Sequence, residues 1–151
     1  MSIRRCDDLL CCNTMRDWAF LKEEHPELFD AGEITDSRHR NLTLFFFLQG
    51  AAPIHVCTVL YRGSYLLLNG RKEIVTVLDF IYDHVPILRN EWKFPGGLPG
   101  NSEEVSIADF PKDTKGRILN IIVPQCSLKI DSEAELNLLR QYYMPFASDA
   151  I

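Results

Sequence analysis

Histidine and cysteine are the residue types of this chain that could bind a zinc ion. His55 and Cys57 are predicted to lie on one face of a strand, two positions apart. More potential ligands lie towards the N-terminus, namely Cys6, Cys11, Cys12 and His25. Structural zinc sites usually show two pairs spaced Cys-x2–4-Cys or His-x3–5-His, and this chain has neither pair. We therefore expect no bound metal or other cofactor, and buried free cysteines.

Cys126 directly follows Val123-Pro124-Gln125, close after a predicted strand. A cysteine placed there could act as a nucleophile if a nearby histidine, His84 or His55, lowered its pKa. No catalytic motif surrounds it, and the chain has no Gly-x-Ser-x-Gly elbow, P-loop or Gly-x-Gly-x-x-Gly. Packing in the core is therefore the default interpretation for Cys126.

Another pattern suited to chemistry is the acid and lysine of Glu91-Trp92-Lys93. It is similar to the Glu-x-Lys end of PD-(D/E)xK nucleases. This resemblance implies that Asp79 or Asp83 shares a divalent metal with Glu91 while Lys93 positions or activates water. The family's aspartate sits on a strand, whereas Asp79 and Asp83 fall in a predicted helix, so an ordinary solvent-facing charge pair is the alternative. A further ligand, of the kind seen in cap-snatching viral endonucleases, would come from Glu23, Glu24 or His25.

The segment Trp92-Lys-Phe-Pro-Gly-Gly97 resembles the approach to the signature box of Nudix hydrolases, and Gly97 and Glu103 keep that box's first spacing. The resemblance ends before the metal ligands of that family. The positions of its Arg-Glu and Glu-Glu pairs here read Pro111-Lys112 and Lys115-Gly116. Lysine and glycine cannot replace carboxylates around Mg²⁺, which requires oxygen ligands. The sequence instead predicts a Pro/Gly loop that its aromatic residues pin to the core.

The charge balance disfavours generic phosphate binding. Sixteen Lys and Arg against 21 Asp and Glu give a net charge of −5, and affinity for nucleic acid depends on cations that neutralise phosphates. The one tight basic cluster, Arg38-His39-Arg40, predicts at most an RNA-binding surface with steep salt dependence. Nucleic acid is therefore third among the functions that we consider.

The chain is predicted to form one domain over residues 1–151, since this length is typical of a single domain with its own core. No apolar stretch of signal-peptide length follows the first charges, and the longest apolar run, Leu44 to Leu48, is too short to cross a membrane. We expect an intracellular protein, cytoplasmic or nuclear, that does not bind membranes and whose cysteines are reduced.

Hydrophobic periodicity in the first half predicts a helix followed by three strands. Asn13 or Thr14 caps the helix and Pro26 ends it, while residues 33–41 read as a loop. The apolar run 42–49 predicts a strand buried on both faces. Residues 54–62 and 65–68 alternate as a hairpin around a Gly63-Ser64 turn.

The second half predicts a helix over 72–85, an unusually long connection over 86–116, and strands over 117–123 and 126–130. The capping box Ser132-x-x-Glu135 begins a last helix. The expected fold class is α+β, with an antiparallel β-meander of three strands, plus one or two C-terminal strands, against two or three helices.

These patterns favour a protein–protein interaction or regulatory accessory module without catalysis, such as a viral protein that intercepts a host factor. A metal-dependent nuclease is the alternative. Large apolar side chains on the long loop and the basic cluster supply the expected binding residues: Trp92, Phe94, Leu98, Phe110, Arg38 and Arg40. An exposed strand edge of the meander would serve a partner protein or a second copy of the chain.

Overall fold

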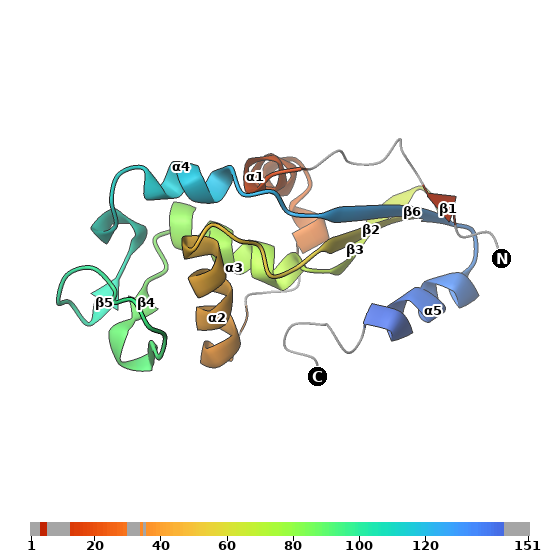
Figure 1. Cartoon of the computed structure of the whole chain (residues 1–151). Helices are drawn as coiled ribbons and strands as arrows, with labels where there is room; N and C mark the ends of the chain where they lie inside the picture. The colour runs from red at the N-terminus through yellow and green to blue at the C-terminus, as the bar shows by residue number, and fades with distance from the viewer. Residues whose placement is uncertain (1–3, 6–12, 30–33, 35, 144–151) are drawn as a thin grey trace.

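The computed structural model describes residues 4–5, 13–29, 34 and 36–143, and it has both helices and a mixed sheet (Figure 1). The sheet has the strand order β1-β6-β2-β3. Its strands are β1 (Arg4–Arg5), β2 (Val56–Tyr61), β3 (Ser64–Asn69) and β6 (Gln125–Ile130). Pairing is antiparallel for β1–β6 and β2–β3 but parallel for β2–β6. The α+β class is confirmed, but the expected all-antiparallel meander is wrong, because β6 inserts beside β2 in parallel.

Helix α1 (Met15–Glu24) begins where the sequence predicted. Thr14 caps it, and Asp17 completes a capping box whose carboxylate accepts hydrogen bonds from the amides of Asn13 at 2.9 Å and Thr14 at 3.1 Å. The helix ends before Pro26, which starts the short 3-10 helix η1 (Pro26–Phe29). Met15 and Trp18 bury the inner face of α1 in the core.

Replacing Asp17 by alanine is expected to lower the free energy of unfolding by about 1 kcal/mol near neutral pH. The amides of Asn13 and then Thr14 lower the pKa of Asp17 by donating hydrogen bonds to it. A carboxyl with a depressed folded-state pKa stabilises the fold above its unfolded pKa, about 3.9, and this contribution is lost as the pH falls through the folded-state pKa. Urea unfolding at a series of pH values should show the difference between the two proteins shrinking in acid. A difference that stays constant, or an equal loss in Glu23→Ala on the same helix, would contradict this account.

Helix α2 (Ser37–Leu48) occupies the segment that the sequence predicted as a loop followed by a buried strand. The loop prediction is wrong from Ser37 on, and the strand prediction is wrong. Asp36 caps the helix by accepting a hydrogen bond from the amide of Arg38 at 3.1 Å. Leu44 and Phe47 are buried, whereas Leu42 and Phe46 are 42% and 36% exposed. The apolar run therefore has one buried and one exposed face, as expected of a helix on the surface of a core.

The hairpin of β2 and β3 is confirmed, with its turn one residue earlier than predicted. The turn residues are Arg62 and Gly63, and Ser64 already pairs with Tyr61. Both turn residues have positive φ, 51° and 76°, which is the geometry that matches the twist of the flanking strands. Arg62 adopts this conformation without being glycine.

The predicted helix over 72–85 is confirmed as α3 (Arg71–Tyr82), which is buried along most of its length. It starts directly after β3, at Gly70, whose φ is +86°.

The predicted strand over 117–123 is wrong. Residues Thr114–Leu119 form helix α4, and only Ile122 makes an isolated bridge, to Thr14. The predicted strand over 126–130 is confirmed as part of β6.

The long connection between α3 and α4 contains short elements rather than one open loop. Strands β4 (Ile87–Leu88) and β5 (Glu104–Val105) pair with each other, and a 3-10 helix follows each of them, η2 (Arg89–Glu91) after β4 and η3 (Ile107–Asp109) after β5. Ile87, Val105 and Ile107 are buried. These buried residues fix the connection to the rest of the core.

The two faces of the main sheet bury different partners. Val56 and Leu67 join a large core with α1, α2, α3, α4 and η1. Cys57, Val59 and Ile130 join a smaller core with Leu136 and Tyr143 of helix α5 (Glu133–Tyr143), which lies along the opposite face (Figure 1). The predicted cap of α5 at Ser132 is confirmed, since Ser132 Oγ accepts from the amide of Glu135 at 3.2 Å and the Ser132 hydroxyl donates to the Glu135 carboxylate at 3.0 Å. None of the helices in the described part of the chain combines the length and apolar character needed to span a membrane.

Candidate binding cleft beside helix α2

A cleft of about 850 Å³ lies between the first turns of α2 on one side and η2 with the residues after it on the other. Its lining comes from two parts of the chain: Asp36, Ser37, Arg38, His39, Asn41 and Leu42 on the α2 side, and Asn90, Glu91, Lys93 and Phe94 on the other. Clefts of this size can bury most of a small ligand or several side chains of a peptide. Apolar side chains here lie between charged ones of both signs.

The wall opposite α2 is held in place by aromatic contacts. The rings of Phe45 and Phe94 are stacked, with centroids 4.8 Å apart and an interplanar angle of 16°. Trp92 lies against both rings, at 6.2 Å from Phe45 and 5.1 Å from Phe94. The side-chain amide of buried Asn41 donates to the carbonyl of Glu91 at 3.2 Å. These contacts fix the 91–94 segment to α2, so the cleft is formed before any ligand binds.

Arg89 holds the Pro/Gly-rich part of the long connection. Its guanidinium donates to three carbonyls, those of Ser102 at 2.7 Å, Leu98 at 3.3 Å and Pro99 at 2.6 Å. A loop rich in proline has few amides to satisfy its own carbonyls, and the five donors of an arginine can replace them. Sequence reasoning missed Arg89, because nothing in the neighbouring residues distinguishes it from a surface arginine.

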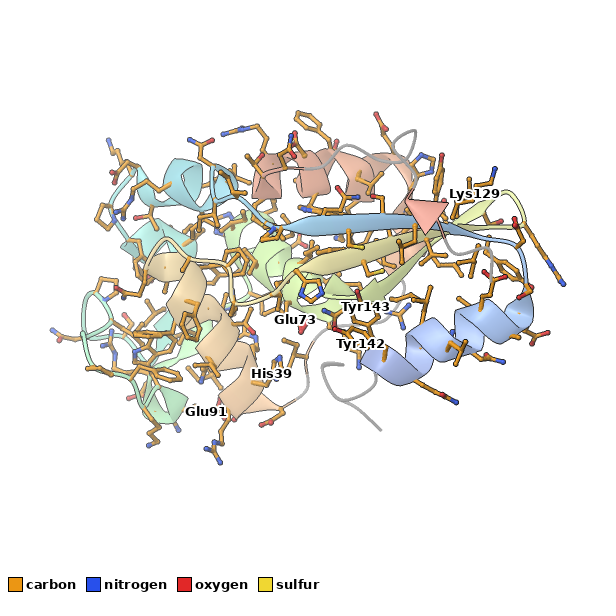
Figure 2. The ribbon with its side chains drawn as sticks, turned by 45° about the vertical axis from the view of Figure 1, so that its right-hand side comes forward. His39, Glu73, Glu91, Lys129, Tyr142 and Tyr143 are labelled. Atoms are coloured by element: carbon orange, nitrogen blue, oxygen red, sulfur yellow. The ribbon has the colours of Figure 1, made fainter. Side chains whose placement is uncertain are left out.

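His39 connects the cleft to a buried carboxylate. Its side chain is 38% exposed, and its Nε2 lies 3.5 Å from Oε1 of Glu73, which is 2% exposed. Figure 2 shows the two side chains on neighbouring helices, His39 on α2 and Glu73 on α3, whereas Glu91 belongs to η2. Burial of a carboxylate is costly unless partners compensate it. The buried Glu73 therefore ties the first turn of α2, and with it one wall of the cleft, to α3.

The two described cysteines lie side by side in the sheet, where Cys57 pairs with Cys126. Burial raises the pKa of Cys57 to about 11, and burial also raises the pKa of Tyr143, which hydrogen-bonds to that thiol. Neither proposed base, His84 or His55, makes a hydrogen bond or ion pair with Cys126 in the part of the chain described. The ring of His55 lies instead 5.7 Å from that of Tyr143. Cys57 and Cys126 are therefore arranged as in a packed core. The other three cysteines, Cys6, Cys11 and Cys12, lie outside the described residues.

The residues of the nuclease hypothesis are divided between separate surfaces. Glu91 and Lys93 line the α2 cleft, and Lys93 Nζ donates to the carbonyl of Asn90 at 3.0 Å. Asp79 and Asp83 lie at the last turn of α3, and Asp83 lines another pocket with Glu23. Within the described ranges, no group of three or more His, Cys, Asp or Glu side chains is placed to hold a metal ion. His25 lies at the end of α1 with its Nδ1 3.2 Å from Glu27.

The expected binding residues occupy different places. Phe94 and Arg38 line the cleft, and Arg38 is exposed there. Trp92, Leu98 and Phe110 are half-buried and pack against the large core. Arg40 is half-buried as well. The cluster 38–40 thus does not form one continuous exposed basic surface.

Comparisons of this chain with protein-family models, with curated proteins and with solved structures found no match.

Proposed function

We propose that this chain is a protein-interaction module without catalysis, and that it binds a short segment of a partner protein in the α2 cleft. The observation that carries this proposal is the exposed Leu42 beside the cleft wall formed by Phe94. Interfaces concentrate binding energy in a few apolar or aromatic anchors that a polar rim surrounds. Leu42 and Phe94 would form the anchor pocket, and the charged residues of the lining would form its rim.

The fixed wall supports binding to a partner. The stacking of Phe45 on Phe94 and the hydrogen bond from Asn41 to Glu91 hold the two sides of the cleft in place. A preformed site loses little side-chain and loop entropy when it binds, which leaves more of the contact energy as affinity. Exposed Phe46, one turn along α2 from Leu42, extends the apolar surface beyond the cleft.

The rim indicates the chemistry of the partner segment. Arg38 and Lys93 contribute positive charge, while Asp36 and Glu91 contribute negative charge. A rim with both signs does not attract a strongly charged polymer such as nucleic acid. It suits a segment with one or two large apolar side chains flanked by polar residues of either sign. No specific observation favours the nuclease hypothesis, since Asp79 and Asp83 do not line this cleft.

Replacing Leu42 by glutamate is expected to weaken binding of peptides selected on this chain by tenfold or more, about 1.4 kcal/mol, because a charge replaces the apolar anchor. Peptides would be selected from a displayed random library on the purified chain, and their affinities measured by fluorescence anisotropy. Leu138→Glu is the matched control, because Leu138 is similarly exposed, at 46%, but lies on α5.

Equal affinity for the wild-type chain and Leu42→Glu would overturn the cleft as the binding site. Equal weakening by Leu138→Glu would show that added charge alone reduces binding. Chemical-shift changes in the bound chain should be centred on residues 36–42 and 90–94, and changes confined to α5 would likewise contradict the proposal.

A further inference from the structure

The open edge of the main sheet offers a second surface, separate from the α2 cleft. Strand β3 is at one end of the strand order, and among the residues that the structure describes it pairs with β2 alone. Beyond it lies a groove of about 430 Å³ that follows the strand from Tyr65 to Leu68. An unpaired strand edge is a template for another extended chain.

The pairing of the hairpin determines which backbone groups face this groove. In a two-residue hairpin the residues beside the turn form a hydrogen-bonded pair, and bonded and non-bonded pairs then alternate. Tyr61 with Ser64 and Val59 with Leu66 are thus the bonded pairs. The N–H and C=O groups of Tyr65 and Leu67 point away from β2, and no hydrogen bond joins them to another segment among the described residues.

Walls on both sides of the edge restrict what can enter. Glu27 and Leu28 of η1 line the groove on the face where Tyr65 and Leu67 meet the large core. Arg140 of α5 lines it on the face where Leu66 and Leu68 meet the small core. If the β3 edge of a second folded copy approached this one, its own η1 and α5 would clash with the η1 and α5 that line the groove. A single extended peptide can lie between them.

The charges of the groove indicate the chemistry of that peptide. Arg71 and Arg140 both line the groove and are exposed, and neither has an ion pair or hydrogen bond in the part of the chain described. Glu27 is the one acid of the lining. Two unneutralised guanidiniums at a groove favour carboxylates, which they can bind through paired hydrogen bonds.

We propose that the β3 edge binds an extended peptide that alternates apolar and acidic residues, by adding it to the sheet as a further strand. The outward groups of Tyr65 and Leu67 would bond to the peptide backbone. Half-buried Tyr65 would contact its apolar side chains on the η1 face, and Arg71 and Arg140 would bind its carboxylates. This surface does not depend on the α2 cleft, so either proposal can fail without the other.

The probe is a fluorescein-labelled eight-residue peptide of alternating valine and glutamate, titrated into the full chain and followed by anisotropy. Two further peptides act as controls, one with N-methylated backbone amides and one with lysine in place of glutamate. Binding of the first peptide should weaken about tenfold or more in each control, because the first control loses backbone donors and the second reverses the charge.

Amide exchange followed by NMR tests the backbone geometry independently. Before the peptide is added, the N–H groups of Tyr65 and Leu67 should exchange fast and that of Leu66 slowly. Saturating peptide should protect Tyr65 and Leu67 and leave Leu66 nearly unchanged. No new protection at Tyr65 and Leu67, or equal affinity for the N-methylated peptide, would overturn the proposal.

Two charge reversals test the arginines. Arg71→Glu and Arg140→Glu should each reduce affinity for the glutamate peptide by about fivefold or more and raise affinity for the lysine peptide. Lys112→Glu is the matched control, since this exposed lysine precedes α4, at the other end of the molecule from α5 (Figure 1). An equal loss in Lys112→Glu would show that net charge rather than the groove governs binding.

Discussion

Replacing Phe47 by alanine is expected to lower the free energy of unfolding by about 3–5 kcal/mol, the usual cost of deleting a buried aromatic side chain. Phe47 is 1% exposed and belongs to the large core. Such a loss is a large fraction of the 5–15 kcal/mol that stabilises a typical domain. Urea unfolding followed by circular dichroism measures it, and the midpoint should fall without a change in slope.

The adjacent Phe46 provides a matched control, because it has the same side chain on the same helix but is 36% exposed. Phe46→Ala should cost about 1 kcal/mol or less, since the transfer and cavity contributions both need burial. Similar large losses in both variants would contradict the helix over 37–48. They would instead indicate a strand buried on both of its faces.

Replacing Gly70 by alanine is expected to lower the free energy of unfolding by about 2–4 kcal/mol, from backbone strain and steric overlap together. The φ of Gly70 is +86°, a conformation that side chains with a Cβ rarely adopt. An added Cβ would lie 3.1 Å from Cγ2 of Val56 and 3.2 Å from Cδ1 of Ile54. It would also lie 3.4 Å from the carbonyl oxygen of His55. Thermal and urea unfolding of the purified variant would measure the loss.

Gly63 separates the two contributions. Its φ is +76°, close to that of Gly70, but a Cβ there would have no heavy atom within 4 Å. Gly63→Ala should therefore show the strain alone, about 1 kcal/mol. The excess loss in Gly70→Ala measures how closely β2 approaches the start of α3. If the two variants lose equal stability, that close approach is wrong.

Local signals in the sequence were sufficient for several elements. Thr14 with Asp17, and Ser132 with Glu135, satisfy the first amides of their helices within four residues of chain, so the interaction is visible in the sequence itself. The spacing of apolar residues correctly predicted α3, because one face of this helix is buried along its length and the pattern repeats every three or four residues. The glycine at position 63 indicated the hairpin turn, and the predicted position of the turn was wrong by only one residue.

The segment 42–49 shows where sequence patterns are ambiguous. A short apolar run is compatible with a buried strand and with a helix, and its periodicity cannot distinguish them. Leu44 and Phe47 face the core, but Leu42 and Phe46 are apolar and remain exposed, which hides the helical pattern. The cap at Asp36 was the local signal that favoured a helix. The α2 cleft depends on this helix, so the sequence could not locate the cleft.

By itself, the sequence determined the α+β class, the β2–β3 hairpin and the helices α1, α3 and α5. It also indicated that aromatic residues pin the long connection to the core, as Trp92 does. The tertiary structure decided that β6 pairs in parallel with β2, where Thr58 Oγ1 lies 2.9 Å from Ser127 Oγ although 69 residues separate them. It also decided that Phe94 stacks on Phe45 of α2, and that the β3 edge remains open between η1 and α5. Caps, turns and periodicity act between residues near each other in the chain. Strand order and clefts depend on contacts between distant residues, which no local pattern specifies.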